Sequence, residues 1–226
     1  MLAGGAVKSA LEAASTPWER ETGHAVKAQY APAGEIAKRL AAGERPDVLV
    51  VPAEALPALE RDGLVDSATR RDLAIVSIGL AVRKGAVVPD ISTPEKLKAT
   101  LLAAHSLTYM DPARGTSGKH VDEVVLPRLG IRDAVRAKAT LGEGGYIAEK
   151  VARGEVELVL HSLTEMAPVE GVVIAGPLPA GLQKDTTYSA VRMREAKHPE
   201  AAAAFLEALA SPRAREAFIS RGYRVP

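Results

Sequence analysis

Four short turns of small residues recur along the 226-residue chain, and each stands before a segment with helical periodicity. They contain the pairs Gly4 and Gly5, Ala33 and Gly34, Thr116 and Ser117, and Gly144 and Gly145. Free backbone N–H groups and the positive end of the helix dipole attract anions to a helix start, and small side chains let a ligand reach the backbone. We therefore expect these turns to share one site for a small anion.

Polar side chains near two of these turns are further candidates for the same site. Arg114 can pair with a carboxylate through two parallel hydrogen bonds, and Tyr146 can donate from the start of the fourth helix. His161 and Ser162 end a predicted strand and are expected to face the ligand. Glu165 is an acid close to these residues, and we expect it at the surface. No metal or cofactor is expected, since no pattern of metal ligands surrounds His161.

Strands and helices alternate along the sequence, which predicts an α/β fold with mostly parallel sheets and helices on both faces. In such sheets the ligand lies at the carboxyl ends of the strands, where the four turns must fall. The predicted strands cover residues 25–30, 47–51, 73–82, 106–110, 157–161, 172–176 and 188–193. The predicted helices cover residues 7–22, 34–43, 53–62, 93–104, 117–129, 145–154, 199–210 and 212–221.

Two lobes are predicted, although the sequence contains no flexible linker. Two strands, at residues 78–83 and 187–192, are expected to cross between the lobes. The first lobe is then discontinuous and consists of residues 1–80 and 190–226, while residues 81–189 form the second lobe. A ligand cleft is expected between them.

Composition excludes several classes of function. Lys and Arg total 29 against 28 for Asp and Glu, so no strong field favours nucleic acid. Cysteine is absent, which removes thiolate metal sites and cysteine nucleophiles, and aromatic residues are only 4% of the chain. The sequence also lacks a phosphate-binding loop, a dinucleotide fingerprint and a nucleophile elbow. Binding without chemistry is therefore the first prediction.

Several short blocks, in this order and spacing, resemble the molybdate-binding family of ABC-transporter solute receptors. They are Gly4-Gly5-Ala6-Val7-Lys8, the stretch from Leu40 to Val50, Asp90-Ile91-Ser92-Thr93-Pro94-Glu95, the stretch from Asp111 to Gly118, Gly144-Gly145-Tyr146, Gly176-Pro177-Leu178-Pro179 and Tyr188-Ser189-Ala190. The resemblance implies a type II periplasmic-binding-protein fold, with two α/β lobes joined by two crossing strands.

The resemblance also implies how such a receptor holds its oxyanion: with serine hydroxyls, backbone amides at helix starts and a tyrosine hydroxyl. In this chain the first serine position falls on Gly5, the second on Ala33 or Gly34, and the tyrosine position near Ser162. The third turn keeps Thr116 and Ser117. A site with fewer hydroxyls favours a carboxylate or larger organic anion over a compact tetrahedral oxyanion.

The resemblance predicts a monomeric extracytoplasmic protein that captures a small anion for the membrane permease of an ABC importer. Periplasmic location is expected, or cytoplasmic location if Met1 is the native start, because no signal peptide precedes it. Aconitate isomerase is similar to these receptors in fold, so an allylic proton-shift isomerase acting on a di- or tricarboxylate is the alternative. A ligand-sensing protein is a further alternative, and binding to nucleic acid is not expected.

Overall fold

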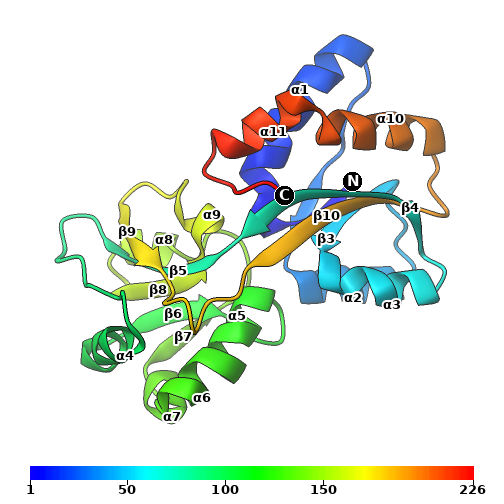
Figure 1. Cartoon of the computed structure of the whole chain (residues 1–226). Coiled ribbons are helices and arrows are strands. Elements are labelled where there is room, and N and C mark those ends of the chain that lie inside the picture. Colours follow the sequence, from blue (N-terminus) through cyan, green and yellow to red (C-terminus); the bar gives the residue numbers. More distant parts are fainter. The chain divides into compact units, whose positions relative to one another are not determined.

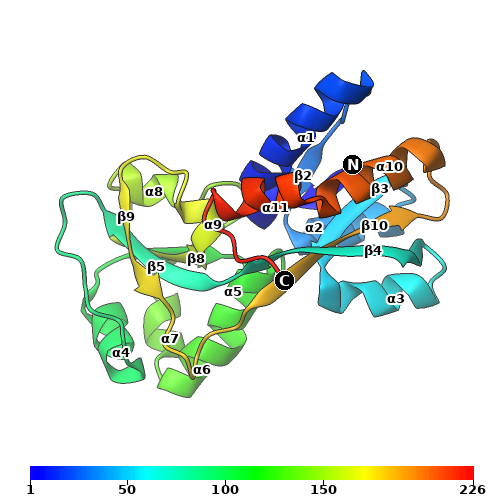
Figure 2. The ribbon, with the colours of Figure 1, turned by 45° about the horizontal axis from the view of Figure 1, so that its top comes forward.

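The computed structural model describes all residues from 1 to 226, and the chain divides into two compact units (Figures 1 and 2). The first unit consists of Met1–Val76 and Thr186–Pro226, and the second of Ser77–Asp185. The chain therefore leaves the first unit after Val76 and returns after Asp185, rather than after residues 80 and 189.

A five-stranded sheet in the order β2-β1-β3-β10-β4 forms the centre of the first unit. Strand β1 is parallel to β2 and β3, whereas β10 is antiparallel to β3 and β4. The strands are β1 (Leu2–Gly4), β2 (Gln29–Ala31), β3 (Val48–Pro52), β4 (Val65–Val76) and β10 (Thr186–Met193).

Helices cover both faces of this sheet (Figure 1). In β3, Val48 and Val50 pack in the cluster formed with α1, α10 and α11, while Leu49 and Val51 pack in the cluster formed with α2 and α3. This alternation is the two-residue period of a strand buried on both faces. The helices are η1 (Gly5–Val7), α1 (Lys8–Thr22), α2 (Ala33–Ala41), η2 (Ala53–Ala55), α3 (Leu56–Arg61), α10 (Pro199–Ala210) and α11 (Pro212–Ile219).

The second unit repeats this plan with a sheet in the order β7-β6-β8-β5-β9. Strand β6 is parallel to β7 and β8, and β5 is antiparallel to β8 and β9. The strands are β5 (Ile78–Arg83), β6 (Leu107–Met110), β7 (Ala139–Gly142), β8 (Leu158–Ser162) and β9 (Val172–Pro177).

Helices again lie on both faces of this second sheet. In β8, Leu160 belongs to the cluster with α4 and α6, and Val159 to the cluster with α8. The helices are α4 (Pro94–Ala103), α5 (Thr116–His120), η3 (Val121–Val125), α6 (Leu126–Leu129), α7 (Arg132–Arg136), α8 (Glu149–Ala152) and α9 (Leu163–Met166). No helix of the chain combines the length and apolar character needed to cross a bilayer.

The structure confirms the predicted fold class and corrects details of it. Each sheet has two parallel and two antiparallel pairings, so the sheets are more mixed than the strand–helix alternation predicts. The predicted strand at 73–82 is two strands, because β4 ends at Val76 and β5 begins at Ile78. Strand β1, of three residues, and strand β7, of four, were not predicted.

Candidate functional site

Gly4 and Gly5 lie where β1 ends and the short helix η1 begins. A Cβ atom at Gly4 would lie 2.5 Å from Cε1 of Tyr188, a buried residue of β10. The absence of a side chain at Gly4 therefore has a packing reason, because the tyrosine ring fills the space. Gly5 is half-buried and opens the helical turn, so its backbone is the part of this motif that remains available for a ligand.

Ala33 and Gly34 are the first two residues of α2. Both are half-buried, and Pro32 precedes them with extended backbone geometry. The Pro32 carbonyl accepts hydrogen bonds from the amides of Glu35 and Ile36, each at 3.0 Å. The amides of Ala33 and Gly34 come earlier in the helix, where N–H groups have no intrahelical acceptor.

In the second unit, a tight loop leads from β6 into α5. The Asp111 carbonyl accepts from the amides of Arg114 (2.9 Å) and Gly115 (3.1 Å), and Asp111 Oδ1 accepts from the amide of Ala113 (2.8 Å). At Gly118, a Cβ atom would lie only 1.9 Å from the Met110 carbonyl oxygen. The loop and Gly118 together bring the start of α5 against the end of β6.

Ser117, in the first turn of α5, contacts a histidine at the end of β8. Its hydroxyl lies 3.1 Å from Nδ1 of His161, at hydrogen-bond distance. The other ring nitrogen of His161, Nε2, lies 3.3 Å from Oε2 of Glu165 in α9. All three residues are buried, with 6%, 1% and 7% of their surface exposed. They form what we call the Ser117–His161–Glu165 chain.

The position of Glu165 corrects the sequence prediction, which placed this acid at the surface. The residue is buried because α9 starts directly after β8 and turns its first residues onto the sheet. His161 and Glu165 are four residues apart, a spacing that joins side chains on a helix. Here His161 is still in the strand, so the sequence did not reveal the contact.

The other predicted residues of this region differ in their surroundings. Ser162 ends β8 and is buried, and Thr116 is half-buried at the first position of α5. Arg114 is half-buried, and its Nε atom has no hydrogen-bond partner. An unpaired guanidinium nitrogen keeps a donor available for an acceptor such as a carboxylate.

The turn at Gly144 and Gly145 is not a helix start, which corrects the prediction. Gly145 has a φ of 69°, in the left-handed region, and α8 begins four residues later at Glu149. Tyr146 is half-buried between these two features instead of within a helix. The predicted helix at 145–154 is correspondingly reduced to Glu149–Ala152.

The helix that begins with α5 continues through a π-helical segment, η3, whose Asp122 is held by three side chains. Asp122 accepts hydrogen bonds from Tyr109 (2.9 Å), Arg132 (2.7 Å) and Arg136 (2.6 and 2.5 Å). Burial acts to raise the pKa of Asp122, but these hydrogen bonds outweigh it and lower the pKa to about 2. The saturated carboxylate anchors the helix and has no free capacity for a ligand.

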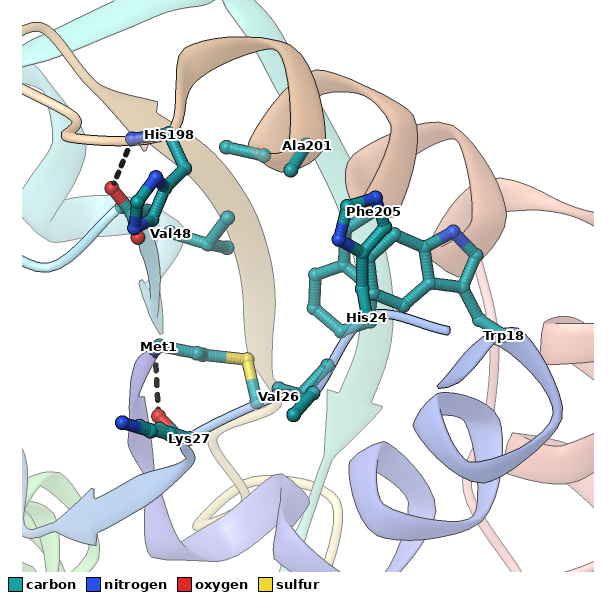
Figure 3. Close-up of a pocket in the computed structure, with 12 residues that line it drawn as sticks. Met1, Trp18, His24, Val26, Lys27, Val48, His198, Ala201 and Phe205 are labelled. Carbon is teal, nitrogen blue, oxygen red and sulfur yellow. Dashed lines mark hydrogen bonds between the residues drawn. The ribbon is translucent and has the colours of Figure 1, made fainter. Parts of the chain in front are cut away.

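The first unit contains a cavity of about 400 Å³ at the amino ends of β1 and β3 (Figure 3). Trp18 forms its aromatic wall. Its ring is stacked on His24, with the ring centroids 5.3 Å apart, and is tilted against Phe205, with the centroids 4.9 Å apart. The amide of His198 donates to Asp47, which also lines the cavity. No predicted site residue lines it, because Gly4 and Gly5 lie at the opposite end of β1.

The structure therefore brings Ser117 and His161 together within the second unit, near Thr116 at the start of α5 and the loop that carries Arg114. Gly4, Gly5, Ala33 and Gly34 belong to the first unit. No group of three or more His, Asp or Glu side chains is arranged to hold a metal ion.

Comparison with known proteins identifies a family and two kinds of relative. Residues 1–224 match the family described as bacterial extracellular solute-binding protein. Aconitate isomerase of Pseudomonas sp. is 34% identical, over 99% of this chain and 86% of that protein. Molybdate-binding protein ModA of Azotobacter vinelandii is 26% identical, over 92% of this chain and 82% of that protein.

Solved structures support the fold. The periplasmic molybdate-binding protein of Azotobacter vinelandii superposes with a TM-score of 0.82 at 19% identity, covering 100% of this chain and 98% of that one. Such similarity at low identity shows that the two chains share the type II periplasmic-binding-protein fold.

Proposed function

Since this chain belongs to the family of bacterial extracellular solute-binding proteins, we propose that it captures a small organic anion, of the carboxylate class. The Ser117 hydroxyl, the Arg114 guanidinium and the backbone at the start of α5 supply the polar contacts from the second unit. Gly5, Ala33 and Gly34, in the first unit, stay predictions from the sequence.

One observation carries this proposal most directly: the Ser117 hydroxyl lies against His161 in a site with little solvent. A buried hydroxyl that is fixed by a second side chain has a defined orientation, which is what selective recognition of a polar ligand requires. The nearby Arg114 Nε without a partner adds a positive donor that suits a carboxylate.

Side-chain chemistry at the first-unit positions supports a carboxylate over a compact oxyanion. Gly5, Ala33 and Gly34 have no hydroxyl, so they can offer backbone amides alone. Fewer hydroxyl donors leave more room and fewer directed hydrogen bonds, which suits a planar carboxylate on a larger body.

The proposal includes the place and partner that the family implies. An extracellular solute-binding protein delivers its ligand to a membrane permease, so we assign the chain to the periplasm and to an ABC importer. It acts there as a monomer, without nucleic acid, metal or cofactor.

A thermal-shift panel tests the proposed ligand class, because a ligand that binds the native state raises its melting temperature. The panel contains molybdate, tungstate, sulfate, phosphate and mono-, di- and tricarboxylates. We expect a rise with one or more carboxylates and none with molybdate or tungstate. A rise with molybdate or tungstate alone would contradict the carboxylate proposal in favour of oxyanion capture.

A second candidate, isomerisation of a di- or tricarboxylate, is favoured by the Ser117–His161–Glu165 chain. A buried hydroxyl–imidazole–carboxylate series can accept a proton from one allylic carbon and return one to the other, so that the double bond moves between them. The 34% identity to a protein named aconitate isomerase also supports this candidate.

Proton NMR of the protein with aconitate separates the two candidates. Under isomerisation, signals of the second isomer grow over hours with the native chain and not with His161→Asn. A mixture that stays unchanged, although aconitate raises the melting temperature, would exclude this candidate and leave capture of the anion.

A further inference from the structure

The position of one proton on His161 decides which hydrogen bonds the Ser117–His161–Glu165 chain can make. A neutral imidazole carries one N–H, so one ring nitrogen donates and the other accepts. The Glu165 carboxylate lies beside Nε2 at ion-pair distance and favours the proton on that nitrogen. Nδ1 must then accept the hydrogen bond from the Ser117 hydroxyl, whose oxygen is 3.1 Å from it.

This arrangement of protons is unfavourable for an anion. When Ser117 donates its proton to His161, its oxygen presents only lone pairs to a ligand, and a carboxylate oxygen would be repelled. A second proton on His161 reverses the polarity, because Nδ1 then donates to the Ser117 oxygen and the hydroxyl proton is free to turn to the ligand. The same two side chains thus repel or bind an anion according to one proton.

We propose that capture of an anion by Ser117 is coupled to the uptake of one proton by His161, with Glu165 compensating the imidazolium charge. This inference rests on the proposed function, since it describes how that site selects its ligand. The balance is simple: the free protein, one anion and one proton from solvent give a complex in which His161 is charged.

The surroundings of His161 favour this assignment. On the neighbouring strand β5, Gly79 is its register partner and adds no charge. On α5, Lys119 is exposed and the His120 Nε2 is engaged by the Leu182 carbonyl at 2.7 Å. On β6, the Tyr109 hydroxyl is bound to Asp122. Glu165 is the one charged side chain within ion-pair distance of His161.

The Nε2 atom of His161 supplies an independent observation. It is buried and has no hydrogen bond, because the 3.3 Å contact to Glu165 has the distance of an ion pair without hydrogen-bond geometry. A buried nitrogen next to a carboxylate gains most from the charged form of the imidazole, where the attraction does not depend on direction. The attraction between Glu165 and a charged imidazole therefore supports the proposal.

Proton uptake makes affinity depend on pH. Where His161 is neutral in the free protein and charged in the complex, each unit of rising pH weakens binding by up to about tenfold. The effect must come from His161 itself, so the ligand used to measure it needs a constant charge.

Isothermal titration calorimetry with trans-aconitate between pH 7.5 and 9 tests the coupling, because its carboxyl groups ionise below this range. Titrations in two buffers of different ionisation enthalpy give the number of protons taken up per ligand. We expect a value approaching one for the native chain and near zero for His161→Asn. Uptake near zero in the native chain, with affinity independent of pH, would overturn the inference.

His105 provides a matched control, since it also pairs with a glutamate, Glu157, at 3.0 Å, but its side chain is 91% exposed. The variant His105→Asn is expected to keep the native proton uptake. If His161→Asn does not fold, Glu165→Gln serves instead, and the pH at which uptake is half complete should then move lower. An unmoved profile in Glu165→Gln would contradict the role of the carboxylate.

Failure of the proposed function would look different. In that case no carboxylate raises the melting temperature and trans-aconitate gives no binding heat. Both the proposed anion site and the proton coupling would then be contradicted. Binding without proton uptake overturns only the coupling.

Discussion

The carbonyl oxygen of Met110 occupies the space beside Gly118, where a Cβ atom would lie only 1.9 Å away. This contact brings the start of α5, and with it Ser117, against the end of β6. The glycine that closes the third small-residue turn is therefore required for packing, whatever binds at that turn.

Gly118→Ala should destabilise the second unit, because the new methyl group meets a backbone atom that cannot rotate away. Overpacking of this kind costs roughly 1–3 kcal/mol. Urea unfolding measures the loss. Gly181→Ala is the control, since Gly181 is exposed with nothing within 4 Å of its Cβ position, and it should leave stability nearly unchanged. Equal stability of the two variants would contradict this role of Gly118.

Asp122→Asn should destabilise the protein by roughly 1–3 kcal/mol, because the buried carboxylate accepts hydrogen bonds from Tyr109 and from two arginines that are themselves half-exposed. The variant leaves Arg132 and Arg136 without the carboxylate that they share. Chemical denaturation at pH 7 provides the measurement. Glu123→Gln, at the adjacent exposed position, is the control and should change stability by less than about 0.5 kcal/mol.

Acid should reduce the difference between the native chain and Asp122→Asn. The folded-state pKa of Asp122, about 2, lies below its ordinary value of 3.8. The contribution of ionised Asp122 to the free energy of unfolding is therefore fully present above pH 3.8. It is lost as the pH falls through about 2, which lowers that free energy by roughly 2 kcal/mol. A difference in unfolding free energy that stays constant from pH 6 to pH 2 would contradict this assignment.

Thr93→Ala should cost about 1 kcal/mol by removing the N-cap of α4, where the threonine hydroxyl accepts from the amide of Lys96 at 3.3 Å. Thr93→Ser keeps an accepting hydroxyl and should keep most of the stability. Thermal unfolding of both variants decides the point, and equal losses in the two would show that the cap contributes nothing.

Local signals in the sequence predicted the helix starts well. Thr93-Pro94 and Ser211-Pro212 each place a hydroxyl directly before a proline that starts a helix, and both hydroxyls accept a hydrogen bond from the amide three residues on. Such caps depend on four consecutive residues, so the sequence contains all the information. The break at Ser77 was missed, since the apolar pattern of residues 73–82 continues through it.

Contacts between distant segments could not be predicted in the same way. The approach of Ser117 to His161 joins residues 44 positions apart, and it depends on the parallel pairing of β6 with β8. Glu165 was expected at the surface because acids usually are, and its burial follows from the turn of α9 onto the sheet. At Gly144 and Gly145, two flexible residues allowed a turn where the pattern predicted a helix.

The central claim is that the Ser117 hydroxyl binds a small organic anion, and calorimetric titration of Ser117→Ala with aconitate tests it most directly. We expect binding to weaken by about 1–3 kcal/mol relative to the native chain, the cost of a lost hydrogen bond to a charged group. Ser220→Ala, at an exposed serine of the other unit, should bind as the native chain does. Unchanged affinity in Ser117→Ala would contradict the claim.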